Sequence, residues 1–324
     1  MPELRVVAPE GVGEVGPGDD LAALLVDALA HQGSGSDLAD GDVVLVTSKA
    51  VSKAEGRVVP GTREEHLPAE TARLVARRGP TQIVRTHHGL TLAAAGIDAS
   101  NVEPGSVVLL PADPDASARA LRARFRELTG RNLAVVVTDT AGRPWREGQT
   151  DVAVGAAGLR VLEDYAGRRD GYGNDLVVTA PAVADELAGA AELAQGKLGG
   201  RPFAVARGRA DLVLPVHDDG PGARALVRPD GSDLFGFGAR EAVLRALLGD
   251  SGDATAFGAP SDATELAELV ELLGGTVRNE DGSLVVAGEI DPGTLKALAF
   301  AHGWEREPVG DSRRVRLRPR GTSP

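Results

Sequence analysis

The chain has 324 residues, of which 42% are hydrophobic and 25% are charged, and its formal net charge is −12. This charge argues against general binding to nucleic acid or to an anionic membrane surface, and the absence of cysteine excludes a disulfide framework and a thiolate zinc site. The apolar runs are strand-sized, and the N-terminal segment lacks the apolar stretch of a signal peptide. We therefore expect a cytoplasmic protein that does not span a membrane.

Runs of β-branched and other apolar residues alternate with amphipathic segments through the first 210 residues. Strands are predicted over 4–9, 42–47, 106–114, 135–137 and 202–208, and a strand, turn and second strand over 81–98. Helices are predicted over 21–32, 62–78, 115–130 and 182–200, with Pro68 in the first turn of the second of these. The segment TSKAVSK after the strand over 42–47 is expected to be a polar loop. This pattern indicates an α+β fold with a mixed sheet.

The composition changes near residue 250, where Gly, Ser, Ala and Asp dominate an aperiodic stretch. We expect a first domain over 1–248, a linker over 249–261 and a small α+β module of unknown role over 262–324. Within that module the pattern predicts a helix, a hairpin around Asp281-Gly282, a second helix over 291–304 and a last strand over 313–319.

The stretch VVVTDTAGRPWREGQTDVAVGAAG, residues 135–158, carries the strongest chemical signal. An apolar strand ends in Asp139 and Thr140, and two arginines follow. Carboxylate and hydroxyl oxygens suit a hard divalent cation, and guanidinium groups suit phosphate or carboxylate. We regard Arg143 and Arg146 as candidates for contacts with substrate anions. The alternative is a strand followed by a solvated polar turn.

Two other segments place polar side chains after apolar ones. TSKAVSKAEGR, 47–57, is either an exposed basic turn or a site for phosphate oxygens, with hydroxyl and basic groups from Ser48, Lys49, Ser52, Lys53 and Arg57. GIDASN, 96–101, offers the carboxylate of Asp98 and the amide of Asn101, or is an Asx-turn.

A glycine-rich helix exit, AQGKLGGRP at 194–202, exposes backbone amides that could meet phosphate, and a plain glycine C-cap explains it almost equally well. His87 and His88 are adjacent on a predicted strand and so face opposite sides, which disfavours a shared metal site.

Together the blocks VLVTSKAVSKAEGR, AAGIDASNV, LLPADPDASA, VVVTDTAGRPWREGQTDVAVGAAGL, DGYGNDLVVTAPAVADELAGAAEL and GKLGGRPFAVARG resemble the F420 γ-glutamyl ligase family. The resemblance runs in order over residues 4 to about 245. It implies an unusual α+β fold and a homodimer. It also implies a GTP-dependent ligase that adds L-glutamate to coenzyme F420-0 and requires Mg²⁺ or Mn²⁺, with K⁺ as a further cation.

The resemblance also implies roles for individual residues. The metal would be held by Asp98, Asp139 and Thr140. The nucleotide would be held by residues of the first loop, the TSKAVSK segment, the GIDASN segment and the glycine-rich helix exit: Val12, Gly13, Glu14, Val15, Ser48, Lys53, Asn101, Gln195, Gly196 and Lys197.

Three departures from the family pattern stand out. The first loop reads Val12-Gly13-Glu14 where the family has Leu-Pro-Glu, and Lys197 aligns with a glutamine that joins the metal shell in archaeal relatives. A protonated lysine cannot ligate a metal, so a phosphate contact is the alternative for Lys197. The tail is too short for the flavin-reductase-like extension of actinobacterial relatives.

Two other functions fit the same residues. A metal-dependent phosphohydrolase could use the same aspartates without forming an amide. A non-catalytic protein that binds GTP or F420 would result if the altered first loop and Lys197 abolished turnover.

Overall fold

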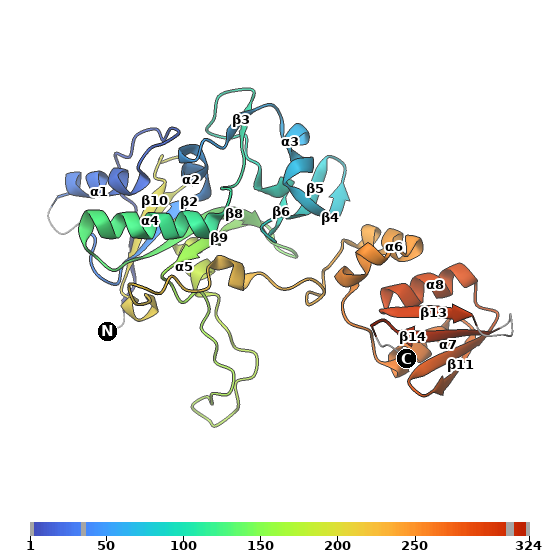
Figure 1. The fold of residues 1–324 in the computed structure, drawn as a ribbon. Helices are drawn as coiled ribbons and strands as arrows, with labels where there is room; N and C mark the ends of the chain where they lie inside the picture. The colour runs from blue at the N-terminus through green and yellow to red at the C-terminus, as the bar shows by residue number, and fades with distance from the viewer. Residues whose placement is uncertain (1–2, 34–36, 309–313, 322–324) are drawn as a thin grey trace. The chain divides into compact units, whose positions relative to one another are not determined.

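The computed structural model describes residues 3–33, 37–308 and 314–321. By compactness the chain divides into two units: the chain up to Arg73 joins Ile83–Val227, and Leu74–Gln82 joins the chain from Arg228 onward. The division expected at residue 248 therefore falls inside the second unit. Helices and strands occur in both units, which confirms the α+β class (Figure 1). No helix among the described residues is both long and apolar enough to cross a bilayer.

A five-stranded mixed sheet with the order β1-β10-β2-β8-β9 forms the centre of the first unit. Its strands are β1 (Arg5–Val7), β2 (Val43–Thr47), β8 (Ala134–Gly142), β9 (Gln149–Ala157) and β10 (Phe203–Arg207). β2 and β8 run parallel, whereas the other neighbouring pairs are antiparallel. The first four residues of β2 are all buried, as expected for a strand covered on both faces.

Helices cover both faces of this sheet (Figure 1). α1 (Leu21–His31) and α4 (Pro114–Thr129) pack against the face that carries Val44 and Val46. α5 (Val183–Gln195) packs against the face that carries Val43 and Leu45. Because successive strand residues point to opposite faces, one apolar run supplies both cores.

Two segments differ from the sequence-based prediction. TSKAVSK is not a loop: Thr47 caps α2 (Ser48–Ala54), which follows β2 without a break. The helix expected over 62–78 is α3 (Arg63–Glu70) followed by β4 (Thr71–Arg78). A capping box begins α3 at Thr62, and Pro68 is its sixth residue rather than part of its first turn. Proline removes a helical hydrogen bond, and the helix ends two residues later.

Smaller elements complete the first unit. β3 (Val58–Pro60) pairs with β7 (Ser106–Val108), and β4, β5 (Thr81–Thr86) and β6 (Thr91–Ala93) form a three-stranded sheet. Residues 74–82 of β4 and β5 are counted with the second unit. The 3₁₀-helices are η1 (Ala94–Gly96), η2 (Ala210–Leu212) and η3 (Ala223–Leu226). A long arm over 163–181 projects from this unit (Figure 1); its two sides are joined by backbone hydrogen bonds such as Tyr165 N to Thr179 O, 3.0 Å.

The second unit has a separate core. Its antiparallel sheet has the order β11-β12-β14-β13, made of β11 (Gly275–Glu280), β12 (Ser283–Gly288), β14 (Arg314–Pro319) and β13 (Trp304–Pro308). α7 (Ala263–Leu272) and α8 (Pro292–Ala301) pack on it around Leu266, Leu284 and Leu317. The hairpin turn at Asp281-Gly282 is confirmed: both residues have positive φ, of 50° and 80°. Arg313, expected to begin the last strand, lies outside the described residues.

The segment expected to be a linker, 249–261, contains η4 (Ser251–Phe257). Ala254 of this helix shares a hydrophobic cluster with Ala246 of α6 (Ala239–Leu248) and Phe300 of α8. The segment was expected to be a linker because it is rich in Gly and Asp, and its few apolar residues gave no sign of these contacts. Residues 74–82 belong to the same unit, since Gly238 N donates to Val75 O over 2.9 Å.

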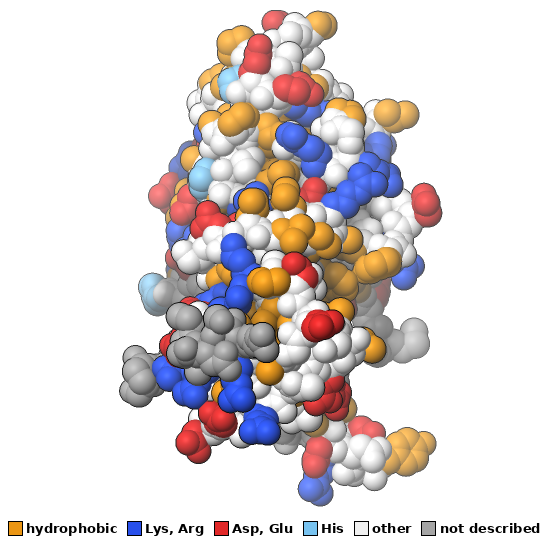
Figure 2. All heavy atoms as spheres, turned by 90° about the vertical axis from the view of Figure 1, so that its right-hand side faces the viewer, with side chains coloured by type: hydrophobic (Ala, Val, Ile, Leu, Met, Phe, Trp, Pro, Cys, Tyr) orange, Lys and Arg blue, Asp and Glu red, His pale blue; other side chains and the backbone are white. Residues whose placement is uncertain are grey.

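Hydrophobic side chains also reach the surface. On the face drawn in Figure 2 they lie among acidic and basic ones. In the second unit, Val243, Leu244, Leu247 and Leu248 of α6 are each more than half exposed. The apolar surface of this unit is therefore not confined to its core.

Candidate active site

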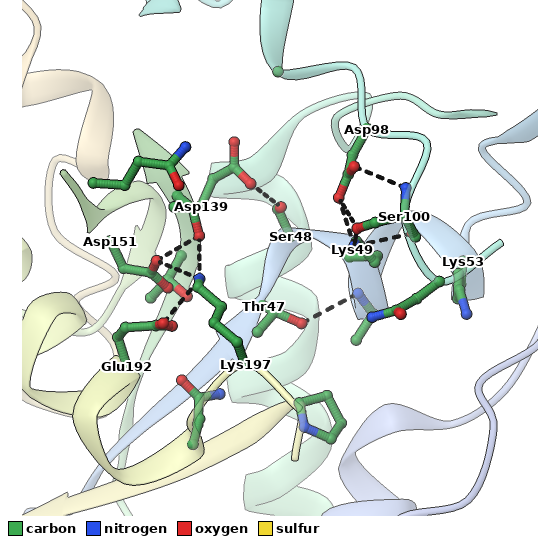
Figure 3. A pocket seen from close by; sticks show the side chains of 18 of the residues that line it. Thr47, Ser48, Lys49, Lys53, Asp98, Ser100, Asp139, Asp151, Glu192 and Lys197 are labelled. Carbon is green, nitrogen blue, oxygen red and sulfur yellow. Dashed lines mark hydrogen bonds and ion pairs between the residues drawn. The ribbon is translucent and has the colours of Figure 1, made fainter. Parts of the chain in front are cut away.

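A cavity of about 760 Å³ opens in the first unit where β2 and β8 end. Its walls come from the first loop, the start of α2, the segment before β7, the β8–β9 hairpin and the exit of α5 (Figure 3). Ligands commonly bind at the carboxyl ends of parallel strands, because loops from neighbouring strands converge there. Most residues singled out by sequence meet in this cavity.

Asp139 and Thr140 lie on β8, where the buried apolar run gives way to polar residues. The register of β8 shifts between Val137 and Thr138, and the following residues pair with β9, so that Thr140 stands opposite Asp151. Thr140 Oγ1 donates to Asp151 Oδ1 over 2.7 Å, and Ser48 Oγ donates to Asp139 Oδ1 over 2.8 Å. The hairpin and the start of α2 thus bring two carboxylates and two hydroxyls to one end of the cavity.

The surroundings of Asp139 disfavour the charged form of its carboxyl. Burial raises the pKa of its carboxyl to about 6; the hydrogen bond from Ser48 opposes this, and the nearby charge of Asp151 adds to it. A carboxylate placed in this way favours a cation beside it. Asp151 itself is only 3% exposed.

Asp98 faces the cavity from the segment before β7, and its backbone pairs with Val108. Lys49 Nζ lies 2.5 Å from Asp98 Oδ2, and Ser100 Oγ donates to the same oxygen over 2.8 Å. Burial alone would raise the pKa of Asp98, but the hydrogen bonds from Lys49 and Ser100 outweigh it and hold the pKa below its usual value. Asp98 is therefore a charged carboxylate.

Lys197 lies across the cavity from Lys49. Its Nζ donates to Thr140 Oγ1 over 2.8 Å and lies 2.8 Å from Glu192 Oε1 and 3.7 Å from Asp151 Oδ1. Burial lowers the pKa of Lys197, but the hydrogen bond to Glu192 and the charge of Asp151 raise it more, so the ammonium stays protonated. Lys197 is thus bonded to carboxylates in this structure.

The residues predicted to hold a nucleotide fall into two groups. The cavity is lined by Gly13, Glu14, Val15, Ser48, Lys53, Asn101, Gln195, Gly196 and Lys197, whereas Val12 is not part of its wall. Lys53 forms an ion pair with Glu14. Gln195 is 2% exposed, and neither its amide nitrogen nor its amide oxygen has a hydrogen-bond partner. A buried amide without partners is rare, and a bound ligand would satisfy it.

Arg143 and Arg146 lie in the β8–β9 turn and do not line the cavity. Arg143 Nη2 donates to Glu147 O within that turn over 2.8 Å. Their contact with a substrate anion stays a prediction.

Sequence reasoning gave no role to Asp151 or Glu192, which both line the cavity, whereas Lys49 was among the phosphate candidates of TSKAVSKAEGR. Asp151 could have been found, because a hairpin turn over 143–148 places it opposite Thr140. Glu192 lies one turn before Gln195 on α5 and so shares its face.

The oxygen atoms present fit a divalent cation. No group of three or more His, Cys, Asp or Glu side chains among the described residues could by itself hold a metal ion. Asp98, Asp139 and Thr140 provide two carboxylates and a hydroxyl instead, the oxygen donors that Mg²⁺ and Mn²⁺ accept. Mg²⁺ usually keeps several waters and shares substrate phosphates, so a small protein set is sufficient.

Comparison with known proteins confirms the family that the sequence resembles. The family model described as F420-0:Gamma-glutamyl ligase matches residues 11–78 and 65–208. The chain belongs to this family. It is 41% identical over 255 residues to the coenzyme F420:L-glutamate ligase of Methanothermobacter thermautotrophicus, a match that covers 72% of this chain and 98% of the relative.

Two further relatives carry the same name. The protein of Methanopyrus kandleri is 39% identical over 259 residues, with 72% of this chain and 98% of the relative covered. That of Archaeoglobus fulgidus is 40% identical over 227 residues, with 63% of this chain and 88% of the relative covered. Each of these matches therefore leaves part of the chain uncovered. The cavity residues, from Gly13 to Pro202, lie within the span of the F420-0:γ-glutamyl ligase family model.

Proposed function

We propose that this protein is a GTP-dependent ligase that joins L-glutamate to coenzyme F420-0, in F420 biosynthesis, with Mg²⁺ or Mn²⁺ as its cation. One observation carries the proposal: Asp98, Asp139, Thr140, Ser48 and Lys53 line one cavity although they come from distant parts of the chain. Relatives that are 39–41% identical to this chain over the aligned residues are named coenzyme F420:L-glutamate ligase.

Asp98, Asp139 and Thr140 would hold the divalent cation. When bound, it would neutralise charge on the nucleotide phosphates and on the transferring phosphoryl group. The raised pKa of Asp139 supports this assignment, because it reflects buried negative charge that no side chain fully offsets.

The reaction needs two steps to balance. The γ-phosphoryl group of GTP passes to the terminal carboxylate of F420-0, which gives GDP and an acyl phosphate. The α-amine of L-glutamate then attacks the acyl carbon, an amide bond forms, and phosphate leaves. Further γ-linked glutamates would be added by repeating the cycle.

The side chains of this cavity would position the reactants and offset their negative charge. Lys49, Lys53 and Arg201 present positive charge for phosphate and carboxylate groups, and the unpartnered amide of Gln195 can bind a polar group of the nucleotide. Holding reactants in line can lower a barrier by roughly 7–11 kcal/mol. A cavity of about 760 Å³ has room for a nucleotide beside an acceptor carboxylate.

We further propose that the protein is a homodimer and that K⁺ assists the reaction. The projecting arm supports the dimer, because Tyr172, Val177 and Val178 on it are 96%, 74% and 90% exposed. Apolar side chains gathered on a projecting segment are typical of surfaces that another chain covers.

Two other functions use the same site. A phosphohydrolase would use Asp98 and Asp139 to hold the cation and would transfer the phosphoryl group to water. A binding protein would hold GTP or F420 without turnover. Ammonium, carboxylate and hydroxyl groups that line one cavity are compatible with the hydrolase and with the binding protein. Analysis of the products distinguishes these two functions from the ligase.

Mass spectrometry of a reaction with purified protein, F420-0, L-glutamate, GTP and Mn²⁺ tests the proposal. We expect a product heavier by one or more glutamate residues that forms only when GTP is present. GTP consumed without this product would indicate the hydrolase, and bound nucleotide without turnover would indicate the binding protein. Replacing GTP by ATP measures the nucleotide preference, and omitting or adding KCl measures the effect of K⁺.

A further inference from the structure

Lys197 is surrounded by oxygen atoms on the metal side of the cavity. Its Nζ lies 2.8 Å from Thr140 Oγ1, 2.8 Å from Glu192 Oε1 and 3.7 Å from Asp151 Oδ1 (Figure 3). A hydroxyl and two carboxylates are the donors that a divalent cation takes from a protein. The ammonium thus occupies a place whose lining suits a free cation.

The position of this ammonium is set by the helix exit. Gly196 follows the last residue of α5 with a φ of 62°, a left-handed conformation that favours glycine. The chain turns there, so the side chain of Lys197 returns toward Glu192 on the last turn of α5. The side chain of Lys197 is 57% exposed, and these contacts hold its ammonium at the acidic end of the cavity.

Charge explains why a cation is needed there. Asp151 is 3% exposed and accepts a hydrogen bond from Thr140, whose neighbour Asp139 contributes a second, partly buried carboxylate. Glu192 adds a third acidic group on the same side. Carboxylates that are clustered and largely shielded from solvent repel one another unless a positive group lies between them.

We propose that the ammonium of Lys197 serves as a built-in cation between Thr140, Asp151 and Glu192, in the place of a second divalent ion. The inference rests on the proposed function, because it assumes that Asp98, Asp139 and Thr140 hold one divalent cation. Lys197 is then a positioning residue: it neutralises Asp151 and Glu192 and orients the hydroxyl of Thr140. One divalent ion is sufficient for this chain, and removal of the ammonium opens a second site.

The experiment counts Mn²⁺ ions bound to the full chain. Mn²⁺ is titrated into the wild type and into Lys197→Ala, Lys197→Gln and Lys197→Arg, and free Mn²⁺ is followed by its electron paramagnetic resonance signal. Lys296→Gln is the matched control, because it removes a lysine whose Nζ donates to Leu248 O in the second unit. Circular dichroism verifies folding; if the alanine variant does not fold, the longer glutamine side chain gives the same comparison.

We expect Lys197→Ala and Lys197→Gln to bind one Mn²⁺ per chain more than the wild type. Lys197→Arg, which keeps the positive charge, and Lys296→Gln should bind the wild-type number. An unchanged number in both neutral variants would overturn the proposal. Because the titration contains no acceptor, glutamate or GTP, its outcome is separate from that of the ligation assay: a chain without ligase activity can still gain a second Mn²⁺.

Discussion

Ser48 Oγ donates a hydrogen bond to Asp139 Oδ1 over 2.8 Å, although 91 positions separate the two residues in the chain. Their meeting follows from the parallel pairing of β2 and β8, which brings Thr47 beside Thr138. α2 begins directly after β2 and is capped by Thr47, so the first residue of the helix points its hydroxyl at the strand next to it. Ser48 thus orients a carboxylate that we assign to the metal.

Ser48→Ala should weaken Mn²⁺ binding. The variant loses the hydrogen bond that favours the charged form of Asp139, and loss of such a supporting contact typically reduces metal affinity by roughly 10–100-fold. Titration of Mn²⁺ measures the change. Ser52→Ala is the matched control on the same helix, because the hydroxyl of Ser52 is buried and has no hydrogen-bond partner. Equal affinities in the two variants would contradict the role given to Ser48.

Asp139→Asn should abolish most metal-dependent ligation while the chain remains folded. The amide keeps the shape and can still accept from Ser48, but it lacks the charge that holds a divalent cation. Loss of metal assistance costs several kcal/mol, on the order of 100-fold or more in rate.

The assay for Asp139→Asn is product formation at saturating Mn²⁺, with a thermal melt to verify the fold. Asp281→Asn is the control, because it removes the same negative charge at a position outside the cavity. It lies in the β11–β12 turn with a φ of 50°, a conformation that asparagine adopts readily. Full activity of Asp139→Asn would refute the metal assignment.

The sequence named many of the residues that line the cavity, but not how the chain brings them together. Apolar runs lead into TSK and VTDT, but only the resemblance to the ligase family implied that Ser48 and Asp139 share one site, and Asp139 lies within β8. The pairing of strands far apart in the chain was not readable, so the contact between Ser48 and Asp139, and the charge cluster of Asp151 and Glu192 around Lys197, appear only in the structure.

Local patterns failed where tertiary contacts decide the outcome. The polar residues of TSKAVSK suggested a loop, yet Ala50 and Val51 bury one face of α2. The periodicity over 62–78 suggested one helix, but the chain after Pro68 becomes a strand of a three-stranded sheet. The segment 249–261 reads as a linker, because the apolar contacts of Ala254 with Phe300 come from a distant part of the chain.

Replacing Val177 and Val178 together by serine should shift the protein toward monomer. Both side chains lie on the projecting arm and are largely exposed, so their replacement cannot disturb the core of the first unit. Size-exclusion chromatography with light scattering gives the mass. The control is Leu272→Ser, which changes a residue that is 80% exposed on α7. A wild-type mass for the arm variant would exclude the arm as the dimer contact.

Leu266→Ala should destabilise the second unit alone. Leu266 is fully buried in a cluster with Trp304, and leucine-to-alanine changes in a core typically cost about 2–5 kcal/mol. Trp304 is 2% exposed and the other tryptophan, Trp145, is 86% exposed in the first unit. In a Trp145→Phe background, fluorescence during urea unfolding therefore reports the second unit. Leu272 on the same helix is exposed, so Leu272→Ala should change the free energy of unfolding by less than about 0.5 kcal/mol. If both variants unfolded at the same urea concentration, Leu266 would not belong to a core that holds α7 to the sheet.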